Sequence, residues 1–366
     1  MERRFEQRNT ESVETVKMNI NDCAQDMESP DAVRMSLAAA MTLGFKNGLF
    51  YRGARLYCIN LLQTYANGCI ANCAYCGLSR GREGSYSQKS FIRVTWPTYT
   101  MDQVIDALVQ NQDAFSRICI SMVTRKRSCA DLVVMAERIL ERVDRPISGL
   151  ISPTVLDRDR LMDIRNSGID KIGIAVDAAT PEIFDRLRGT GVKAPHRWHK
   201  YWEIFDQAVE IFGAREVGSH LIVGLGESER EMAHRLQDVY DRGGLTHLFS
   251  FYPEANSQMS DCTYPSAGQY RRIQLARYLI DEGIASADGF SFADTGRILN
   301  FGLSSAVLEE IINSGEPFRT SGCAGRDGVT ACNRPFANFP PGEHIRNYPF
   351  PPEPEDIEKI RQELDS

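Results

Sequence analysis

The stretch Tyr65-Ala-Asn-Gly-Cys69-Ile-Ala-Asn-Cys73-Ala-Tyr-Cys76 organises the rest of this chain. Its three cysteines follow a C-x3-C-x2-C spacing, and Tyr75 precedes the third. Three neighbouring thiolates suit an iron–sulfur cluster, because cluster irons take cysteine sulfur as a ligand. A cubane has one iron more than three cysteines can bind, and an open position favours chemistry over a structural role. A zinc site would place a fourth Cys or His nearby, whereas the next cysteine is Cys119.

The composition is that of an ordinary globular protein, with 366 residues of which 42% are apolar and 25% charged. The net charge of −7 argues against general nucleic-acid binding, which goes with a basic excess. No apolar run is long enough to span a bilayer, and residues 1–20 are too polar for a signal peptide. We therefore expect a cytoplasmic protein without membrane or nucleic-acid partners. Its ten cysteines are then expected to serve metal or redox chemistry rather than disulfides.

From Leu56 onward, short apolar runs alternate six times with amphipathic runs. This alternation predicts a parallel α/β sheet with right-handed crossovers, either a barrel-like (β/α)6 sheet or an open doubly wound one. In both architectures the site lies at the carboxyl ends of the strands, which is where the cysteine stretch falls. The expected strands cover 56–62, 117–123, 147–151, 171–176, 217–223 and 246–251. The expected helices cover 101–108, 131–140, 157–166, 181–187, 229–240 and 270–281.

The two flanks of the chain break this rhythm. Residues 1–50 are expected to form a helical extension, because apolar residues recur at helical spacing after Ser29-Pro30-Asp31. Residues 51–285 would form the main domain. Residues 286–366 are expected to form an irregular extension, since proline and glycine rise there.

A second pair of cysteines, Cys323 and Cys332, stands in the glycine-rich run 320–336. Glycines allow such a loop to wrap closely around an inorganic centre, and the alternative is an ordinary surface loop. Two cysteines do not hold a cubane, so further ligands would come from elsewhere, with Cys119, Cys58 and Ser321 as candidates. Cys119 would point into a barrel if its strand parity is right, whereas Cys58 starts its strand, toward the opposite end.

The cysteine spacing, with an aromatic residue before the last cysteine, resembles that of the radical S-adenosylmethionine (SAM) enzymes. The resemblance implies a [4Fe-4S] cluster on Cys69, Cys73 and Cys76 whose open iron binds SAM. One electron from that cluster then cleaves SAM to a 5′-deoxyadenosyl radical. The resemblance also favours a partial (β/α)6 TIM-like barrel, with N-terminal helices and a C-terminal irregular extension.

The same resemblance implies SAM contacts at other strand ends. Asp177 is the candidate for the SAM ribose, with a helix cap as the alternative. Arg188 is the candidate for the SAM carboxylate, with an exposed helix-end arginine as the alternative. Ser121 occupies the place where backbone groups hold the SAM amino group, although the Gly-Gly-Glu often found there is missing. Residues 219–227 resemble the glycine-containing motif along the adenine, and Tyr75 is counted with the cofactor-binding residues.

Three runs narrow the resemblance further: Asn60-Leu-Leu-Gln-Thr-Tyr65, Cys76-Gly-Leu-Ser79, and Thr320-Ser-Gly-Cys with Cys332-Asn-Arg-Pro-Phe336. They resemble the LipS family, the two-component, biotin-synthase-like lipoyl synthases. That family is expected to have a closely spaced cysteine pair before Asn-Arg-Pro, and the loop here is longer. The resemblance implies an auxiliary iron–sulfur cluster on Cys323 and Cys332 that gives up sulfur.

The implied substrate is an octanoyl chain on a lysine of a carrier protein, with sulfur inserted at C6 or C8. The implied partners are an octanoylated lipoyl domain or glycine cleavage H-like protein, a related partner synthase, and an electron donor such as ferredoxin or flavodoxin. Two alternatives stay open. One is another biotin-synthase-like reaction, such as biotin formation or a carbon-skeleton rearrangement, and the other is a non-catalytic metal-cluster protein.

Overall fold

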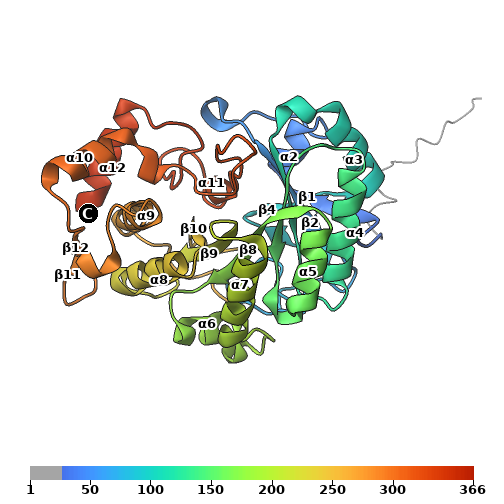
Figure 1. The fold of residues 1–366 in the computed structure, drawn as a ribbon, viewed down its shortest axis with the longest axis horizontal. Helices are drawn as coiled ribbons and strands as arrows, with labels where there is room; N and C mark the ends of the chain where they lie inside the picture. The colour runs from blue at the N-terminus through green and yellow to red at the C-terminus, as the bar shows by residue number, and fades with distance from the viewer. Residues whose placement is uncertain (1–26) are drawn as a thin grey trace, which may run out of the picture.

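Six parallel strands form the centre of the computed structural model, which describes residues 27–366 (Figure 1). They lie in the order β10-β9-β8-β7-β6-β2, so each strand pairs with the one before it in this series. All six coincide with predicted strands, and the α/β class with a mostly parallel, partial-barrel sheet is confirmed. The strands are β2 (Cys58–Gln63), β6 (Arg117–Ser121), β7 (Ile147–Ile151), β8 (Ile169–Asp177), β9 (Val217–Val223) and β10 (Leu245–Ser250).

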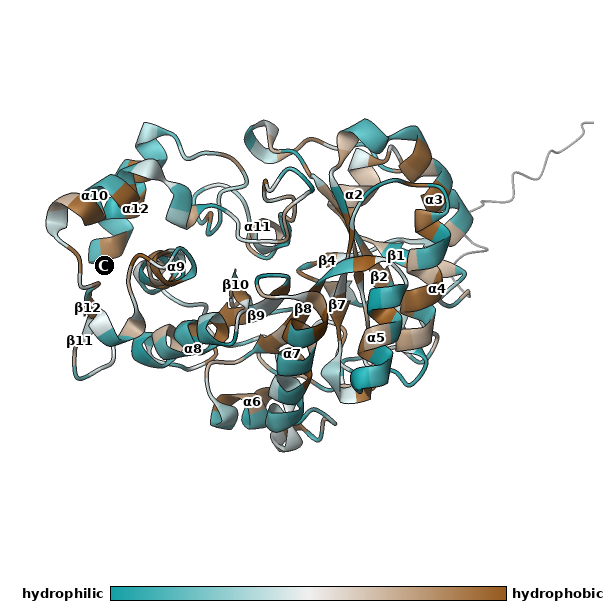
Figure 2. Cartoon of the chain, viewed as in Figure 1, coloured by the Kyte–Doolittle hydropathy of each residue, from teal (hydrophilic) through white to brown (hydrophobic). Residues whose placement is uncertain are grey.

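Helices connect these strands and cover the outer face of the sheet. Ile118 and Ile120 of β6 are fully buried in the core between the two layers, and burying each such side chain contributes about 1.5–3 kcal/mol. Figure 2 shows brown, hydrophobic residues on the strands and teal, hydrophilic residues on the outer helices. Only α7 among these helices lacks a predicted counterpart. The helices are α3 (Met101–Gln110), α4 (Ser128–Leu140), α5 (Arg158–Asn166), α6 (Pro181–Arg188), α7 (Trp198–Phe212), α8 (Glu229–Asp241) and α9 (Ala267–Asp281).

The strand register decides which side chains face the interior of the barrel. Cys58 lies opposite Arg117, and Asn60 lies opposite Cys119. Because alternate residues of a strand share a face, Cys58, Asn60 and Cys119 point to the same side. Cys58 and Cys119 are buried in one cluster with Leu150 of β7. Two cysteines from neighbouring strands therefore enter the interior together.

Two short strands extend the sheet beyond β2. β1 (Ala32–Met35) pairs antiparallel with β2, and β5 (Thr98–Thr100) pairs antiparallel with β1. The helix α2 (Leu37–Thr42) follows β1. The predicted helical extension is therefore wrong for residues 32–35, because an apolar run this short does not separate the two periodicities. The rest of that prediction, over residues 1–26, lies outside the described residues. A small hairpin of β3 (Ser90–Phe91) and β4 (Val94–Thr95) follows the cysteine loop.

The C-terminal part of the chain covers the free edge of β10. The backbone N–H of Leu248 donates to Oγ of Ser321 at 3.2 Å, and its carbonyl accepts from the hydroxyl of Tyr270 at 3.1 Å. The side-chain amide of Asn338 donates to the carbonyl of Ser250. An uncovered edge strand would leave such backbone groups unpaired. This cover brings residues 320–336 against the interior of the barrel.

The extension is irregular between residues 319 and 333, as predicted, but it also contains helices (Figure 1). The fully buried Arg271 of α9 donates to Glu363 of α12 at 2.7 Å, which ties the extension to the main domain. The proposed boundaries at residues 50 and 285 stay predictions. Every helix between residues 27 and 366 is too short or too polar to cross a bilayer. The elements are β11 (Ser291–Phe292), β12 (Ile298–Asn300), α10 (Ser305–Ser314), α11 (Arg334–Ala337) and α12 (Pro354–Asp365).

Candidate active site

The loop that carries Cys69, Cys73 and Cys76 follows the carboxyl end of β2. Gly68 turns the chain with a φ of 56°, and a Cβ there would lie 2.5 Å from the ring of Tyr86. Sγ of Cys69 and Sγ of Cys76 each accept a hydrogen bond, at 3.4 Å, from the backbone N–H two residues further on. All three cysteines line one cavity of about 200 Å³. We call them the first thiol group.

The surroundings of the first thiol group suit a multi-iron cluster. Burial raises the pKa of the Cys73 thiol to about 12, and it raises the pKa of Cys76 well above its usual range. Bound iron would reverse this effect, because metal ligation takes the thiolate. Within residues 27–366, no three His, Cys, Asp or Glu side chains stand close enough to share a single metal ion. A cluster, whose cysteines bind different irons, fits this arrangement better than zinc does.

A buried ion pair lines the same cavity. The guanidinium of Arg188 pairs with the carboxylate of Asp177, which also accepts from the hydroxyl of Tyr75 at 2.5 Å. Asp177 has a φ of 66°, in the left-handed region, which costs a non-glycine residue about 1–2 kcal/mol. The structure therefore brings Tyr75, Asp177 and Arg188 together beside the first thiol group, held in a strained backbone conformation.

Two alternative roles for this pair do not fit the structure. The N-cap of α6 is Thr180, whose side chain accepts from the N–H of Ile183 at 3.3 Å, so Asp177 does not serve as the cap. Arg188 is only 4% exposed, so it is no surface arginine. The contacts of Asp177 and Arg188 with SAM stay predictions.

A chain of hydrogen bonds behind Arg188 fixes its orientation. Arg188 donates to the hydroxyl of Tyr201 at 2.9 Å. That hydroxyl lies 3.0 Å from Nδ1 of His196, which is 2.5 Å from Oγ1 of Thr154. Burial, together with the charge of Arg188, lowers the pKa of His196 to about 2, so its ring is neutral. The guanidinium is therefore the fixed positive charge on this wall of the cavity.

Ser121 is the one predicted SAM-binding residue that does not line the cavity of the first thiol group. Its Oγ is buried, has no hydrogen-bond partner among the described residues, and does not line the cavity, although Met122 does. The sequence predicts that backbone groups near Ser121, not its side chain, hold the SAM amino group, and this contact stays a prediction.

The predicted adenine motif, residues 219–227, contributes His220 and Ile222 to the cavity wall, but not its glycines. The carboxylate of Glu227 accepts from the backbone N–H of Gly224 at 2.7 Å and of Leu225 at 2.9 Å. The glycine therefore shapes the turn after β9, with a φ of 103° at Gly224. Burial raises the pKa of Glu227 to about 7.

Cys323 and Cys332 lie side by side in the C-terminal loop. The carbonyl of Cys323 accepts from the backbone N–H of Ala331 at 3.0 Å and of Cys332 at 3.2 Å. Gly322 permits this approach, because a Cβ there would lie 2.5 Å from the carbonyl oxygen of Cys332. With Cys119, both cysteines line a small cavity of about 20 Å³.

Cys58 completes this set, and we call Cys58, Cys119, Cys323 and Cys332 the second thiol group. The neighbouring Cys332 thiol, together with burial, raises the pKa of Cys58 well above its usual range. Cys58 lies at the start of its strand, at the amino end of the barrel. The C-terminal loop also reaches this end, so Cys58 and Cys332 still come together. Ser321 lines the same small cavity, and its Oγ accepts a hydrogen bond from the backbone N–H of Leu248 in β10.

Arg334 received no role from the sequence, and the structure places it between the two thiol groups. Its Nε donates to Asn60 at 3.0 Å, and its Nη2 donates to Sγ of Cys119 at 3.5 Å. Arg334 lines both the 200 Å³ cavity and the 20 Å³ cavity. Leu150, His220 and Phe249 also line both, so the two cavities adjoin. The available signal was the Asn-Arg-Pro run that contains Arg334.

Glu254 is a second residue that sequence reasoning missed. Glu254 is buried and lines the 200 Å³ cavity. Its carboxylate accepts hydrogen bonds from Oγ of Ser90 at 2.8 Å and from the backbone N–H of Arg93 at 2.6 Å. It therefore joins the loop after β10 to the segment after the cysteine loop.

Comparison with known proteins bears on residues 64–239, which match the model of the Radical SAM superfamily. A GTP 3′,8-cyclase from Picosynechococcus is 25% identical over 133 residues, which cover 36% of this chain and 39% of that protein. The match to this curated relative therefore spans about two fifths of its length.

Several solved structures are similar over part of the chain. The [FeFe]-hydrogenase maturase HydG has a TM-score of 0.48 at 15% identity, covering 67% of this chain and 53% of HydG. Coproporphyrinogen III oxidase (HemN) from Escherichia coli has a TM-score of 0.35 at 19% identity, covering 58% of this chain and 51% of HemN. The methyltransferase TsrM from Kitasatospora setae has a TM-score of 0.38 at 12% identity, covering 85% of this chain and 62% of TsrM. Likenesses at these TM-scores do not bear on the function.

The family match begins directly after β2 and covers the cysteine loop and the strands up to β9. The match to this superfamily implies a [4Fe-4S] cluster and SAM, and the first thiol group provides the residues that would hold the cluster. Residues 64–239 of this chain are thus similar to the catalytic domain of the Radical SAM superfamily.

Proposed function

We propose that this protein is a lipoyl synthase component that inserts sulfur at C6 or C8 of an octanoyl chain on a lysine of a carrier protein. One observation carries the proposal: a second thiol group lies in the barrel interior and adjoins the cavity of the first. An enzyme that inserts sulfur into a C–H bond needs two sources within reach of one carbon, a radical and a sulfur.

The second thiol group is suited to an auxiliary iron–sulfur cluster. It supplies four thiols, which is the number that the common clusters take. Burial raises the pKa of Cys323 to about 12, and the charge of Arg117 opposes this shift. The charge of Arg334 favours the thiolate form of Cys332. When bound, the SAM cluster would supply the electron that generates the radical, and the auxiliary cluster would supply the sulfur. The ligands Cys323, Cys332, Cys119 and Cys58 follow from this reading, with Ser321 as the remaining oxygen candidate.

The cavity between the two groups suits an alkyl chain. Its wall contains Leu62, Leu150, Ile222 and Phe249, and Leu150 and Phe249 continue into the smaller cavity. An apolar wall binds an acyl chain by excluding water, and it protects a reactive radical for the same reason. The charged groups Asp177 and Arg188 line the 200 Å³ cavity, where SAM would bind, and not the 20 Å³ cavity.

Three partners follow from this function. An octanoylated lipoyl domain or glycine cleavage H-like protein would present the chain, a related synthase would carry out the other insertion, and ferredoxin or flavodoxin would supply electrons. The carrier would dock at the mouth of the 200 Å³ cavity, whose lining includes Glu254.

The test is a product assay with an octanoylated lysine peptide, SAM and a chemical reductant, with and without a related partner synthase. The expected result is one sulfur added to the peptide and 5′-deoxyadenosine formed. The Cys323→Ala/Cys332→Ala variant should still cleave SAM but add no sulfur and bind less iron. The surface variant Cys262→Ala is the matched control, since Cys262 is exposed.

Three results would contradict the proposal. Sulfur added to desthiobiotin and not to the peptide would indicate biotin formation instead. Iron content that is unchanged in Cys323→Ala/Cys332→Ala would remove the auxiliary cluster, and no SAM cleavage in the wild type would leave a non-catalytic cluster protein.

A further inference from the structure

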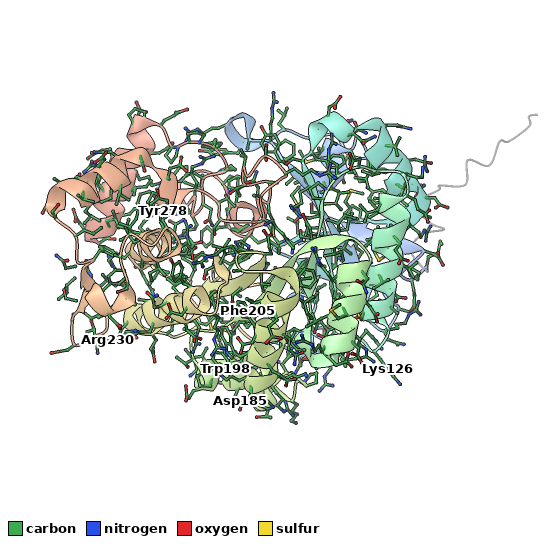
Figure 3. The ribbon with its side chains drawn as sticks, viewed as in Figure 1. Lys126, Asp185, Trp198, Phe205, Arg230 and Tyr278 are labelled. Atoms are coloured by element: carbon green, nitrogen blue, oxygen red, sulfur yellow. The ribbon has the colours of Figure 1, made fainter. Side chains whose placement is uncertain are left out.

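A large cavity opens at the amino ends of β8, β9 and β10, away from the cysteine loop. Its volume is about 500 Å³, and it shares no lining residue with the 200 Å³ cavity at the carboxyl ends. Lys171, Gly218 and Leu245, near the starts of the three strands, form one wall. Tyr278 on α9, labelled in Figure 3, belongs to another wall, and residues 316–330 of the extension close a third.

This amino-end cavity reaches the second thiol group. Cys323 lines it and also lines the small cavity that holds Cys119 and Cys332. Ser321, Gly322 and His247 line both as well. A small molecule in the amino-end cavity would therefore stand beside the second thiol group without passing the first.

Four buried polar atoms on the wall of this cavity have no hydrogen-bond partner among the described residues. They are Oγ1 of Thr246, Nδ1 of His247, Nε of Arg277 and the hydroxyl of Tyr348. Each parent residue is at least nine-tenths buried. Leaving such a group unpaired costs about 1–3 kcal/mol. The guanidinium N–H can only donate, and both hydroxyls can donate, so the wall favours a ligand that accepts hydrogen bonds.

The charged groups at the cavity largely neutralise each other. Lys171 pairs with Glu216, Arg319 pairs with Glu316 at 2.8 Å, and Arg277 lies 3.7 Å from Asp281. A wall of paired charges gives no strong attraction for a polyanion such as a nucleotide. A small, singly charged acceptor is the better match.

We propose that the amino-end cavity is a second entrance to the second thiol group, and that it admits the small hydrosulfide anion, which loses its proton on becoming cluster sulfide. The inference rests on the proposed function, because each insertion removes sulfur from the auxiliary site, and that sulfur must be replaced. The carboxyl-end cavity cannot serve during turnover, since SAM and the acyl chain would fill it.

The test narrows the entrance and follows the accessibility of Cys323. Val329 is 58% exposed and lines the amino-end cavity, so Val329→Trp places a large ring at its mouth. Val134 on α4 is 39% exposed and lines none of the three cavities, so Val134→Trp is the matched control. The probe is 2-sulfonatoethyl methanethiosulfonate, a small anion that reacts with thiols. Labelling of each cysteine in the metal-free full chain is timed by peptide mass spectrometry.

Labelling of Cys323 should slow by about tenfold in Val329→Trp, because thiol modification follows exposure. Labelling of Cys69 should not change in that variant, and Val134→Trp should match the wild type at both positions. An unchanged Cys323 rate in Val329→Trp would refute the entrance. Equal slowing at Cys69 and Cys323 would also refute it, since a general change in the fold would then explain the effect.

A second readout uses the full chain during anaerobic cluster assembly from ferrous iron and sulfide. Assembly of the second cluster should slow in Val329→Trp, while assembly of the first should keep its wild-type rate. A wild-type chain that takes up one cluster only would end the proposed function, and the Cys323 labelling would still decide the entrance. Normal cluster uptake with unchanged Cys323 labelling would end the entrance alone.

Discussion

The two thiol groups of this protein are built in different ways. The first comes from one loop, where backbone N–H groups two residues away already point at Cys69 and Cys76. The second takes Cys58 from β2, Cys119 from β6 and two cysteines from the C-terminal loop. The first group therefore needs a local turn, whereas the second needs correct strand register and a docked extension.

The electrostatic surroundings of the two groups also differ. Beside the first group, the charge of Arg188 is compensated by Asp177. Beside the second, Arg334 has no carboxylate partner among the described residues and donates to Cys119. Arg117, which is paired with Asp170, also holds the C-terminal loop by donating to the carbonyl of Ala324 at 2.5 Å. The second group therefore collects its cysteines from three separate segments of the chain, whereas the first takes all three from one loop.

The largest expected effect of a single substitution is at the first group. Asp177→Asn leaves the buried Arg188 without its carboxylate, which should lower the free energy of unfolding by about 3–5 kcal/mol. Urea unfolding of the metal-free chain measures this. Asp102→Asn, which removes an exposed partner of Arg138, should leave the midpoint unchanged. Equal midpoints for the two variants would mean that the Asp177–Arg188 pair does not stabilise this side of the barrel.

A pH effect should appear on the same side, at Glu227. Its carboxyl has a pKa raised from 4.5 to about 7, because burial disfavours the charged form. The neutral carboxyl therefore contributes stability below pH 4.5, and this contribution is lost as the pH rises through about 7. The total is about 3 kcal/mol. Glu227→Gln should flatten the stability curve across this window. The same slope in both proteins would show that Glu227 ionises without cost.

A smaller effect is expected at the second group from Arg334→Lys. A lysine retains the charge but cannot donate to both Asn60 and Cys119 as the planar guanidinium does. We expect iron binding at the second group to weaken by about tenfold, as for other outer contacts of metal ligands. Iron titration of the chain measures this, with Arg138→Lys as the surface control. Equal weakening at the first group would erase the distinction between the two.

The contrast between the groups also explains what the sequence could and could not predict. The six parallel strands were predictable because their buried runs are apolar throughout and separated by amphipathic helices. Cys69, Cys73 and Cys76 were predictable because one loop holds them all. The only sequence signal for Cys323 and Cys332 was the glycine-rich loop around them. The close approach of these two cysteines depends on Gly322.

Other features were not predictable, because they depend on contacts between distant segments. Arg334 donates a hydrogen bond to Asn60, which lies 274 residues earlier in the sequence. No local sequence pattern predicts such a contact. Cys58 joins Cys332 only because the C-terminal loop reaches the amino end of the barrel. The short strands β1 and β5 were missed for a related reason, since each is defined by its partner rather than by its own sequence.

The central claim is that the chain holds two separate iron–sulfur sites. The most direct measurement is the iron and sulfide content of the Cys69→Ala/Cys73→Ala/Cys76→Ala variant after anaerobic reconstitution. We expect about half of the wild-type content, because the second group would still hold its cluster. A content at the background level of a metal-free protein would contradict it, since all the iron would then have depended on the cysteine loop.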